Sequence, residues 1–168
     1  ETYSWATYKW CDGTENSLTK YCTNSQYGAN GFEDGKTILE PEDDAAHVHW
    51  GGKWRMPSDE EMTELREKCT WTLTSINGVD GYEVTGPSGN SIFLPAAGFY
   101  FVDGYRSYGN GDYWSTKATN TNGACHLYFY SDHHSRSSSY RYFGFLIRPV
   151  YDDRPSVPAK RIGVFSVA

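Results

Sequence analysis

The sequence has no apolar run approaching the roughly 18 residues of a membrane-spanning helix, and no basic segment followed by an apolar one at its start. Acidic residues exceed basic ones, giving a formal net charge of -6, and the acids lie mostly before residue 84. This distribution opposes attraction to a phosphate backbone. We therefore expect neither membrane insertion by this domain nor binding to nucleic acid.

Motifs for metal binding and nucleophilic catalysis are also missing. There is no CxxC pair and no closed zinc spacing, so the four cysteines are disulfide partners or buried thiols, and their three possible pairings stay open. The segment GPSGN lacks the GxSxG spacing of a serine hydrolase and is typical of a hairpin turn. His47 and His49 come without HExxH, and the acids of residues 40–44 fit a helix start better than a calcium or acid-base cluster. The cysteines are Cys11, Cys22, Cys69 and Cys125.

Aromatic side chains are abundant and take the place of much of the usual aliphatic filling. The chain contains 14 Tyr, 6 Trp and 8 Phe. Its length of 168 residues is enough for one domain with a core. Because Tyr and Trp carry polar tips, many of them should reach the surface. We expect residues 1–151 to form this domain and residues 152–168, rich in charge and proline, to be a linker or the start of a following module.

Helices are expected in the first half of the chain and strands in the second. Residues 41–50 begin with Pro41 and three acids, which favours a short helix. PSDEEMTELREKC predicts a clearer one, because Ser58 and Glu61 form a capping box and Met62 and Leu65 share one face with Cys69. The segment 81–96 predicts a hairpin. Helices followed by strands, without a βαβ rhythm, predict an α+β domain.

Residues 128–143, near the end of the expected strand region, have an unusual composition. We expect CHLYFY and YRYFGFLIRPV to be strands joined by a polar loop at residues 131–139, after an irregular glycine-rich segment at residues 98–115. Residues 128–143, YFYSDHHSRSSSYRYF, contain no Lys, Glu or aliphatic residue but four Tyr and five Ser. Tyr gives rigid contact area and Ser adapts around it, so this composition indicates a recognition surface. The alternative is an aromatic outer sheet face with a serine-rich flexible loop.

A metal site is a weaker possibility in the same segment. His126, Asp132, His133 and His134 carry suitable ligand groups, but adjacent loop residues rarely converge on one ion. We expect no metal and no cofactor here.

Several ordered motifs resemble a known family. WGGKWRMP, NSIFLPAAGFY, GDYWST and FLIRPV resemble the FISUMP-type (major paralogous) domains of Bacteroidetes surface proteins, over residues 3–151. The resemblance implies a C-type lectin-like fold, with two helices, a small irregular antiparallel sheet and long glycine-rich loops, related to formylglycine-generating-enzyme-like modules. It also implies an extracellular or cell-surface location, with neighbouring domains and a lipid anchor outside this sequence.

The resemblance extends to variable proteins of diversity-generating retroelements, whose rewritten codons never yield Lys, Glu, Gln, Met or Trp. None of these five types occurs between Ala118 and Ala159. Inside that window Leu127 and Phe129 alternate with polar and aromatic residues, as one strand facing core and solvent would.

The sequence departs from the catalytic and sugar-binding relatives. Calcium-dependent lectins carry Glu-Pro-Asn or Gln-Pro-Asp together with Trp-Asn-Asp, whereas here Glu40, Pro41 and Glu42 begin an expected helix and no Trp-Asn-Asp occurs. Cys125 has no nearby partner for formylglycine chemistry. We therefore expect a non-enzymatic module that binds a protein or glycan ligand, or alternatively a structural module of a surface appendage. The predicted ligand-binding residues are His126, Tyr128, Tyr130, His133, His134, Arg136, Tyr140, Tyr142 and Phe143, extended by Tyr105, Arg106 and Tyr108.

Overall fold

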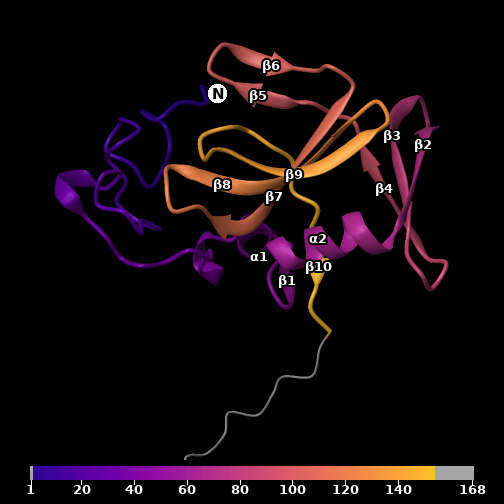
Figure 1. The fold of residues 1–168 in the computed structure, drawn as a ribbon, viewed down its shortest axis with the longest axis horizontal. Helices are drawn as coiled ribbons and strands as arrows, with labels where there is room; N and C mark the ends of the chain where they lie inside the picture. Colours follow the sequence, from indigo (N-terminus) through magenta and orange to yellow (C-terminus); the bar gives the residue numbers. More distant parts are fainter. Residues whose placement is uncertain (1, 154–168) are drawn as a thin grey trace, which may run out of the picture.

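In the computed structural model, which describes residues 2–153, strands dominate and pair into four small antiparallel sheets (Figure 1). The larger sheets have the orders β2-β3-β4 and β7-β8-β9, and the smaller ones pair β1 with β10 and β5 with β6. The helices are α1 (Ala45–Trp50) and α2 (Asp59–Lys68), with 3-10 turns η1 (Ala29–Gly31) and η2 (Pro41–Asp43). The strands are β1 (Trp54–Arg55), β2 (Thr70–Ile76), β3 (Val79–Thr85), β4 (Ser91–Pro95), β5 (Phe99–Phe101), β6 (Gly104–Arg106), β7 (Asn110–Ala118), β8 (Gly123–Tyr130), β9 (His133–Tyr140) and β10 (Val150–Tyr151).

The expected α+β class with a C-type lectin-like fold is therefore wrong. Among the described residues there are ten strands, spread over four sheets, against two short α-helices. The error has two sources. The glycine-rich segment forms the β5–β6 hairpin and the start of β7, and the segment expected to be a polar loop forms β9. The expected linker or following module at residues 152–168 lies, beyond Asp153, outside the described residues.

Local sequence determines where α2 begins. The Ser58 hydroxyl accepts a hydrogen bond from the Glu61 N–H at 3.1 Å, and the Glu61 carboxylate accepts one from the Ser58 N–H at 2.8 Å. The predicted capping box is thus confirmed. The predicted helix at residues 41–50 divides into η2 and α1, because Asp44 leaves helical geometry and caps α1 by accepting from the N–H groups of Ala46 and His47.

Turn residues close the hairpins. Asn77 and Gly78, both at positive φ, join β2 to β3, as expected for a two-residue hairpin turn. The predicted hairpin in residues 81–96 is present as β3 and β4, and GPSGN is its turn, closed by a hydrogen bond from the Gly89 N–H to the Gly86 carbonyl at 2.9 Å. The serine of this segment is therefore a turn residue.

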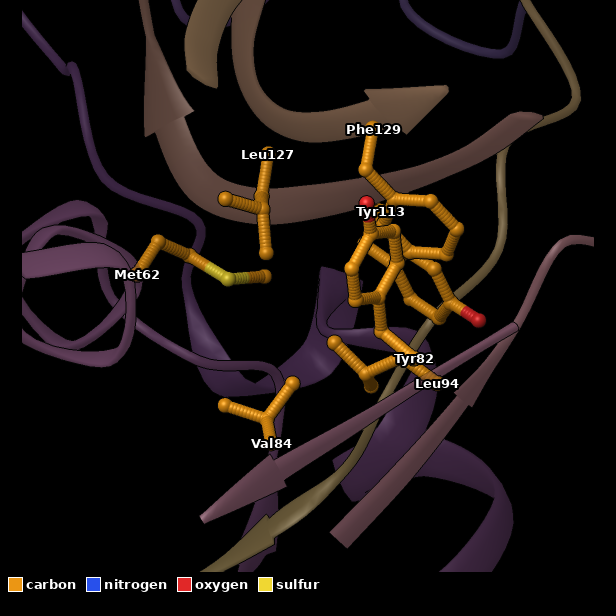
Figure 2. Packing of buried hydrophobic residues seen from close by; sticks show 7 residues of the cluster. All are labelled: Met62, Tyr82, Val84, Leu94, Tyr113, Leu127 and Phe129. Carbon is orange, nitrogen blue, oxygen red and sulfur yellow. The ribbon is translucent and has the colours of Figure 1, made fainter. Parts of the chain in front are cut away.

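The core lies between the β7–β8–β9 sheet, the β2–β3–β4 sheet and α2 (Figures 1 and 2). Figure 2 shows the Met62 side chain pointing from α2 toward Leu127, while the ring of Phe129 lies beside Tyr82 and Tyr113. Ring centroids of Tyr82 and Phe129 are 5.1 Å apart in an edge-to-face arrangement. Buried phenol groups are satisfied, because Tyr113 donates to the Pro95 carbonyl at 2.8 Å.

Residues 2–40 form turns, the 3-10 turn η1 and isolated bridges beside the β7–β8–β9 sheet rather than a strand of their own. Arg141, which is buried, ties them to the sheet by donating to the carbonyls of Tyr21 at 2.9 Å, Gly123 at 2.8 Å and Thr121 at 2.8 Å. The Asp43 carboxylate connects the N-terminal segment to η2 by accepting hydrogen bonds from Tyr21 and Lys20, both at 2.6 Å. The acids Asp43 and Glu40, which also pairs with Lys20, therefore anchor the N-terminal segment.

We predict that Leu127→Ala lowers the free energy of unfolding by about 3 kcal/mol, because it removes a fully enclosed side chain from the centre of the core. Urea unfolding followed by circular dichroism measures this change. Leu73→Ala is the matched control, since Leu73 is exposed on β2 and should cost less than about 0.5 kcal/mol. Equal effects of the two substitutions would contradict this placement of the core.

Candidate ligand-binding face

The β8 strand places aromatic side chains on the side of its sheet that faces away from the core. Leu127 and Phe129 are 0% and 1% exposed, so the alternation of a strand turns Tyr128 and Tyr130 to the opposite side. Register adds Asn110 and Asp112 from β7 and His133, Ser135 and Ser137 from β9 to the same side. We call this set the outer face: Asn110, Asp112, Tyr128, Tyr130, His133, Ser135 and Ser137.

Three rings on the outer face form a cluster at the tip of the β8–β9 hairpin. The rings of Tyr128 and Tyr130 are parallel within 8° with centroids 6.2 Å apart. His133 lies 5.8 Å from the first ring and 5.5 Å from the second, and its Nε2 is 3.4 Å from the Tyr128 hydroxyl. Tyr130 is 50% exposed. The cluster is ordered by its own contacts and remains open to solvent, although the stretch holding His133 was expected to be a loop.

His126 does not belong to this exposed cluster, and the expectation that it is displayed is wrong. It is 5% exposed, because Trp114 and Phe145 cover its ring with centroids 5.7 and 4.7 Å away. Its Nε2 contacts the Ser139 hydroxyl at 3.2 Å. Its Nδ1 lies 3.4 Å from an Asp112 carboxylate oxygen, within ion-pair distance, but the geometry does not make a hydrogen bond.

His134 faces the core side of β9 and is likewise not displayed. Its ring stacks on Trp71 at 4.4 Å and 7°. Burial lowers the pKa of His134 from its ordinary value of 6.5, and the neighbouring His133 adds to this effect. The strand alternation that exposes His133 therefore turns His134 to the core side, where it packs on Trp71.

Arg136 also faces the core side, where it forms an ion pair with α2. Its guanidinium donates to both carboxylate oxygens of Asp59, from Nε at 3.0 Å and from Nη2. Asp59 is buried and also accepts from Lys117 Nζ at 3.3 Å. The expectation that Arg136 is free to contact a ligand is wrong, because its guanidinium is engaged by the buried Asp59 carboxylate on the core side of the sheet. The other arginine of this stretch, Arg141, is buried and bonded to the N-terminal segment.

Tyr140, Tyr142 and Phe143 form a second aromatic group at the opposite end of β9. The Trp5 ring contacts Tyr140 and Tyr142 edge-to-face at 5.6 and 5.0 Å, and Phe143 lies 5.0 Å from Tyr142. Seven strand steps separate Tyr140 from His133, which is about 24 Å at the usual rise per residue. The predicted residues thus do not share one continuous face.

The segment YRYFGFLIRPV, expected to be a strand, instead turns after β9. The Phe143 N–H donates to the Tyr140 carbonyl at 3.1 Å, isolated bridges follow at Gly144 and Leu146, and the last residue of the segment, Val150, begins β10. Phe145 then packs on Trp114 with centroids 4.4 Å apart. Tertiary packing of the phenylalanines replaces strand pairing here.

Tyr105, Arg106 and Tyr108 lie in and after the β5–β6 hairpin. The Tyr105 ring contacts Tyr100 in a tilted arrangement with centroids 5.4 Å apart, and Arg106 pairs with Asp103. Tyr108 is the most exposed of the three, and its N–H donates at 3.1 Å to Asn110, whose register partner is Tyr130. Tyr108 therefore leads into the outer face, whereas Tyr105 and Arg106 belong to a separate hairpin.

No group of three or more His, Cys, Asp or Glu side chains between residues 2 and 153 is placed to hold a metal ion. All four cysteines lie in that part of the chain and are free thiols, and burial raises the pKa of Cys125. Over the same residues, no helix has the length and apolar character needed to cross a membrane.

The outer face also contains residues that sequence reasoning missed. Asn110 and Asp112 alternate with Gly111 and Tyr113 along β7, which was the available signal. Asn110 donates its side-chain amide to Asp112, so these polar groups are held in place beside the tyrosines. Comparison with models of known families, with curated proteins and with solved structures finds no match to this chain.

We predict that Arg136→Met destabilises the fold by about 2 kcal/mol, because the buried Asp59 would keep only Lys117 as a charged partner. Denaturant unfolding measures the loss. Arg106→Met is the control, since its partner Asp103 is exposed and such surface pairs contribute roughly 0.5 kcal/mol or less. Unchanged stability of Arg136→Met would show that the ion pair is not structural.

The lowered pKa of His134 predicts a pH dependence of stability. The unfolded chain binds a proton at this residue more readily than the folded one, so stability is complete above about pH 6.5 and falls as the pH drops through the lowered folded-state pKa. Urea titrations between about pH 7.5 and pH 5 should show a shallower fall for His134→Phe than for the wild type. His49→Gln, which removes a histidine from an exposed site on α1, is the control for the loss of a histidine as such.

Proposed function

We propose that this chain is a non-enzymatic ligand-binding module of a surface or secreted bacterial protein, and that it binds a protein or glycan through the outer face. The observation that carries the proposal is the exposed cluster of Tyr128, Tyr130 and His133. Tyrosine supplies large contact area with little loss of side-chain freedom, and rings already held by one another lose still less on binding.

The surroundings of the cluster support recognition. Ser135 and Ser137 lie beside the rings on β9, and small hydroxyl side chains adapt to a ligand without obstructing it. No lysine or glutamate lies on the outer face, so few strongly hydrated charges need to lose water on binding. The residues that hold the fold, Leu127 and Phe129, are on the opposite side of the strand.

A catalytic alternative receives little support. Asp112, His126 and Ser139 form a row across β7, β8 and β9 that has the chemical groups of a serine-hydrolase relay. Such a relay needs a hydrogen bond from the carboxylate to the histidine and an accessible nucleophile beside it. Here the bond to Asp112 is not made, His126 is closed off, and Ser139 lies within a regular strand.

The sequence resemblance to FISUMP-type domains of Bacteroidetes surface proteins supports the proposed location outside the cell. It also fits a diversified retroelement target within residues 118–150. In β8, outward positions such as Tyr128 and Tyr130 could vary while Leu127 and Phe129 continued to hold the core.

A second candidate function is a structural module that packs against a neighbouring domain of the same polypeptide. One observation favours it: Trp50 and Tyr151 are more than half exposed and lie on either side of Trp54 in ring contact with it. The Trp54 ring lies 5.0 Å from Trp50 and 5.2 Å from Tyr151. We call these three residues the tryptophan patch. An exposed apolar patch of this kind is typical of a contact surface.

The proposal predicts that Tyr130→Ala raises the Kd for a ligand found on an array of glycans and surface proteins by roughly 30-fold, since truncation of a hot-spot tyrosine costs about 2 kcal/mol. Binding should persist when a chelator is present. Tyr151→Ala is a matched control, because Tyr151 is 54% exposed, like Tyr130, but lies on β10.

The two variants separate the two functions. Binding that survives both Tyr130→Ala and Tyr128→Ala would contradict the outer-face proposal. If Tyr151→Ala loses the contact with a neighbouring domain of the same polypeptide and Tyr130→Ala keeps it, the function would be the structural one, carried by the tryptophan patch.

A further inference from the structure

The β9 strand has a partner on one side only. In the sheet order β7-β8-β9 it is an outer strand, and its eight residues pair with β8 without interruption, from His133 opposite Tyr130 to Tyr140 opposite Gly123. The β7–β8 ladder, in contrast, is irregular between Trp114 and Ala118. Nothing else between residues 2 and 153 pairs with β9.

The register determines which backbone N–H and C=O groups of β9 do not hydrogen-bond to β8. Ser131 and Asp132 form a two-residue turn, so Tyr130 and His133 are a hydrogen-bonded pair, and such pairs alternate with non-bonded ones along an antiparallel ladder. The N–H and C=O groups of His134, Arg136 and Ser138 therefore point away from β8. No backbone hydrogen bond of the described chain outside its helices and strands uses them.

This edge lacks the features that normally prevent strand addition. Edge strands are commonly protected by Lys, Pro, a bulge or a covering segment. HHSRSSSY contains neither Lys nor Pro, its ladder to β8 has no bulge, and its arginine is neutralised by Asp59. An approaching strand would meet a regular row of donors and acceptors without a repelling charge.

The edge is continuous with the outer face. Ser135 and Ser137 stand between the free edge and the ring cluster, on the same side of the sheet as Tyr128 and Tyr130. Neighbouring strands are about 4.8 Å apart, so an added strand would lie two strand spacings from β8. The serine hydroxyls of β9 would lie between that strand and Tyr128, and the His133 ring between it and Tyr130. The small serines leave room for alternate side chains of that strand to reach the tyrosine rings.

We infer that the ligand is a protein, and that an extended, uncharged segment of it adds to the β9 edge while its alternate side chains contact Tyr128 and Tyr130. This inference rests on the proposed function and narrows it from protein or glycan to an extended polypeptide. Main-chain hydrogen bonds supply affinity in this mode, and the side chains beside the rings supply specificity.

The test uses a library of linear peptides selected on the immobilised protein, with a glycan array in parallel. Ser138→Pro removes an outward N–H without removing a bond to β8, and edge strands tolerate proline at such positions. We expect it to weaken binding of the selected peptides about tenfold or more. Ser138→Ala, which keeps the N–H, should bind like the wild type.

A second measurement covers the case in which Ser138→Pro does not fold. Hydrogen exchange of the wild-type protein should show the amides of His134, Arg136 and Ser138 exchanging quickly when free and slowly with a selected peptide bound. Unchanged exchange at these amides would overturn the inference.

Further outcomes separate this inference from the proposed function. Peptide binding lost in Tyr130→Ala but retained in folded Ser138→Pro would support the outer face and overturn edge addition. Binding to glycans, with no peptide selected from the library, would likewise support the outer face and overturn edge addition. A dimer that Ser138→Pro dissociates would assign the edge to a second copy of this chain and overturn the inference.

Discussion

The alternation of side chains along β8 is the constraint on which the rest of the structure depends. Leu127 and Phe129 fill the space between the sheet, α2 and β3, and this fixes which way every other residue of the strand points. A shift of one residue would bury Tyr128 and Tyr130 and expose the core. The candidate binding face is therefore a consequence of core packing, and the two cannot change independently.

Two ionic contacts at the rim of the core share one buried carboxylate, that of Asp59. Asp59 caps no backbone group of its own helix end but receives Arg136 from β9 and Lys117 from β7, which connects α2 to both outer strands of the sheet. Pairing of this kind gives little net stability, but it is costly to break. The Arg136–Asp59 pair links β9 to α2, although half of the residues of β9 are serine, a type with little strand preference of its own.

Sequence reasoning succeeded where the structural cause is local. The capping box of Ser58 and Glu61 and the GPSGN turn involve neighbours within a few positions, and the structure confirms both. It failed where the cause is distant. Arg136 meets Asp59 at a sequence separation of 77 residues, and β9 is a strand because β8 lies beside it. His126 carries a polar ring, but Trp114 and Phe145 enclose it. The predicted fold class was wrong for the same reason. The serine-rich and glycine-rich segments pair into hairpins, although their composition does not predict strands.

Arg141 joins the N-terminal segment to the sheet through main-chain acceptors. Its guanidinium donates to the carbonyls of Tyr21, Gly123 and Thr121, and every residue type presents the same carbonyl. A change of side chain at Thr121 therefore leaves the acceptor for Arg141 in place. Tyr21 differs, because its buried side chain also donates to Asp43, so the connection depends on the path of the main chain at one end and on a particular side chain at the other.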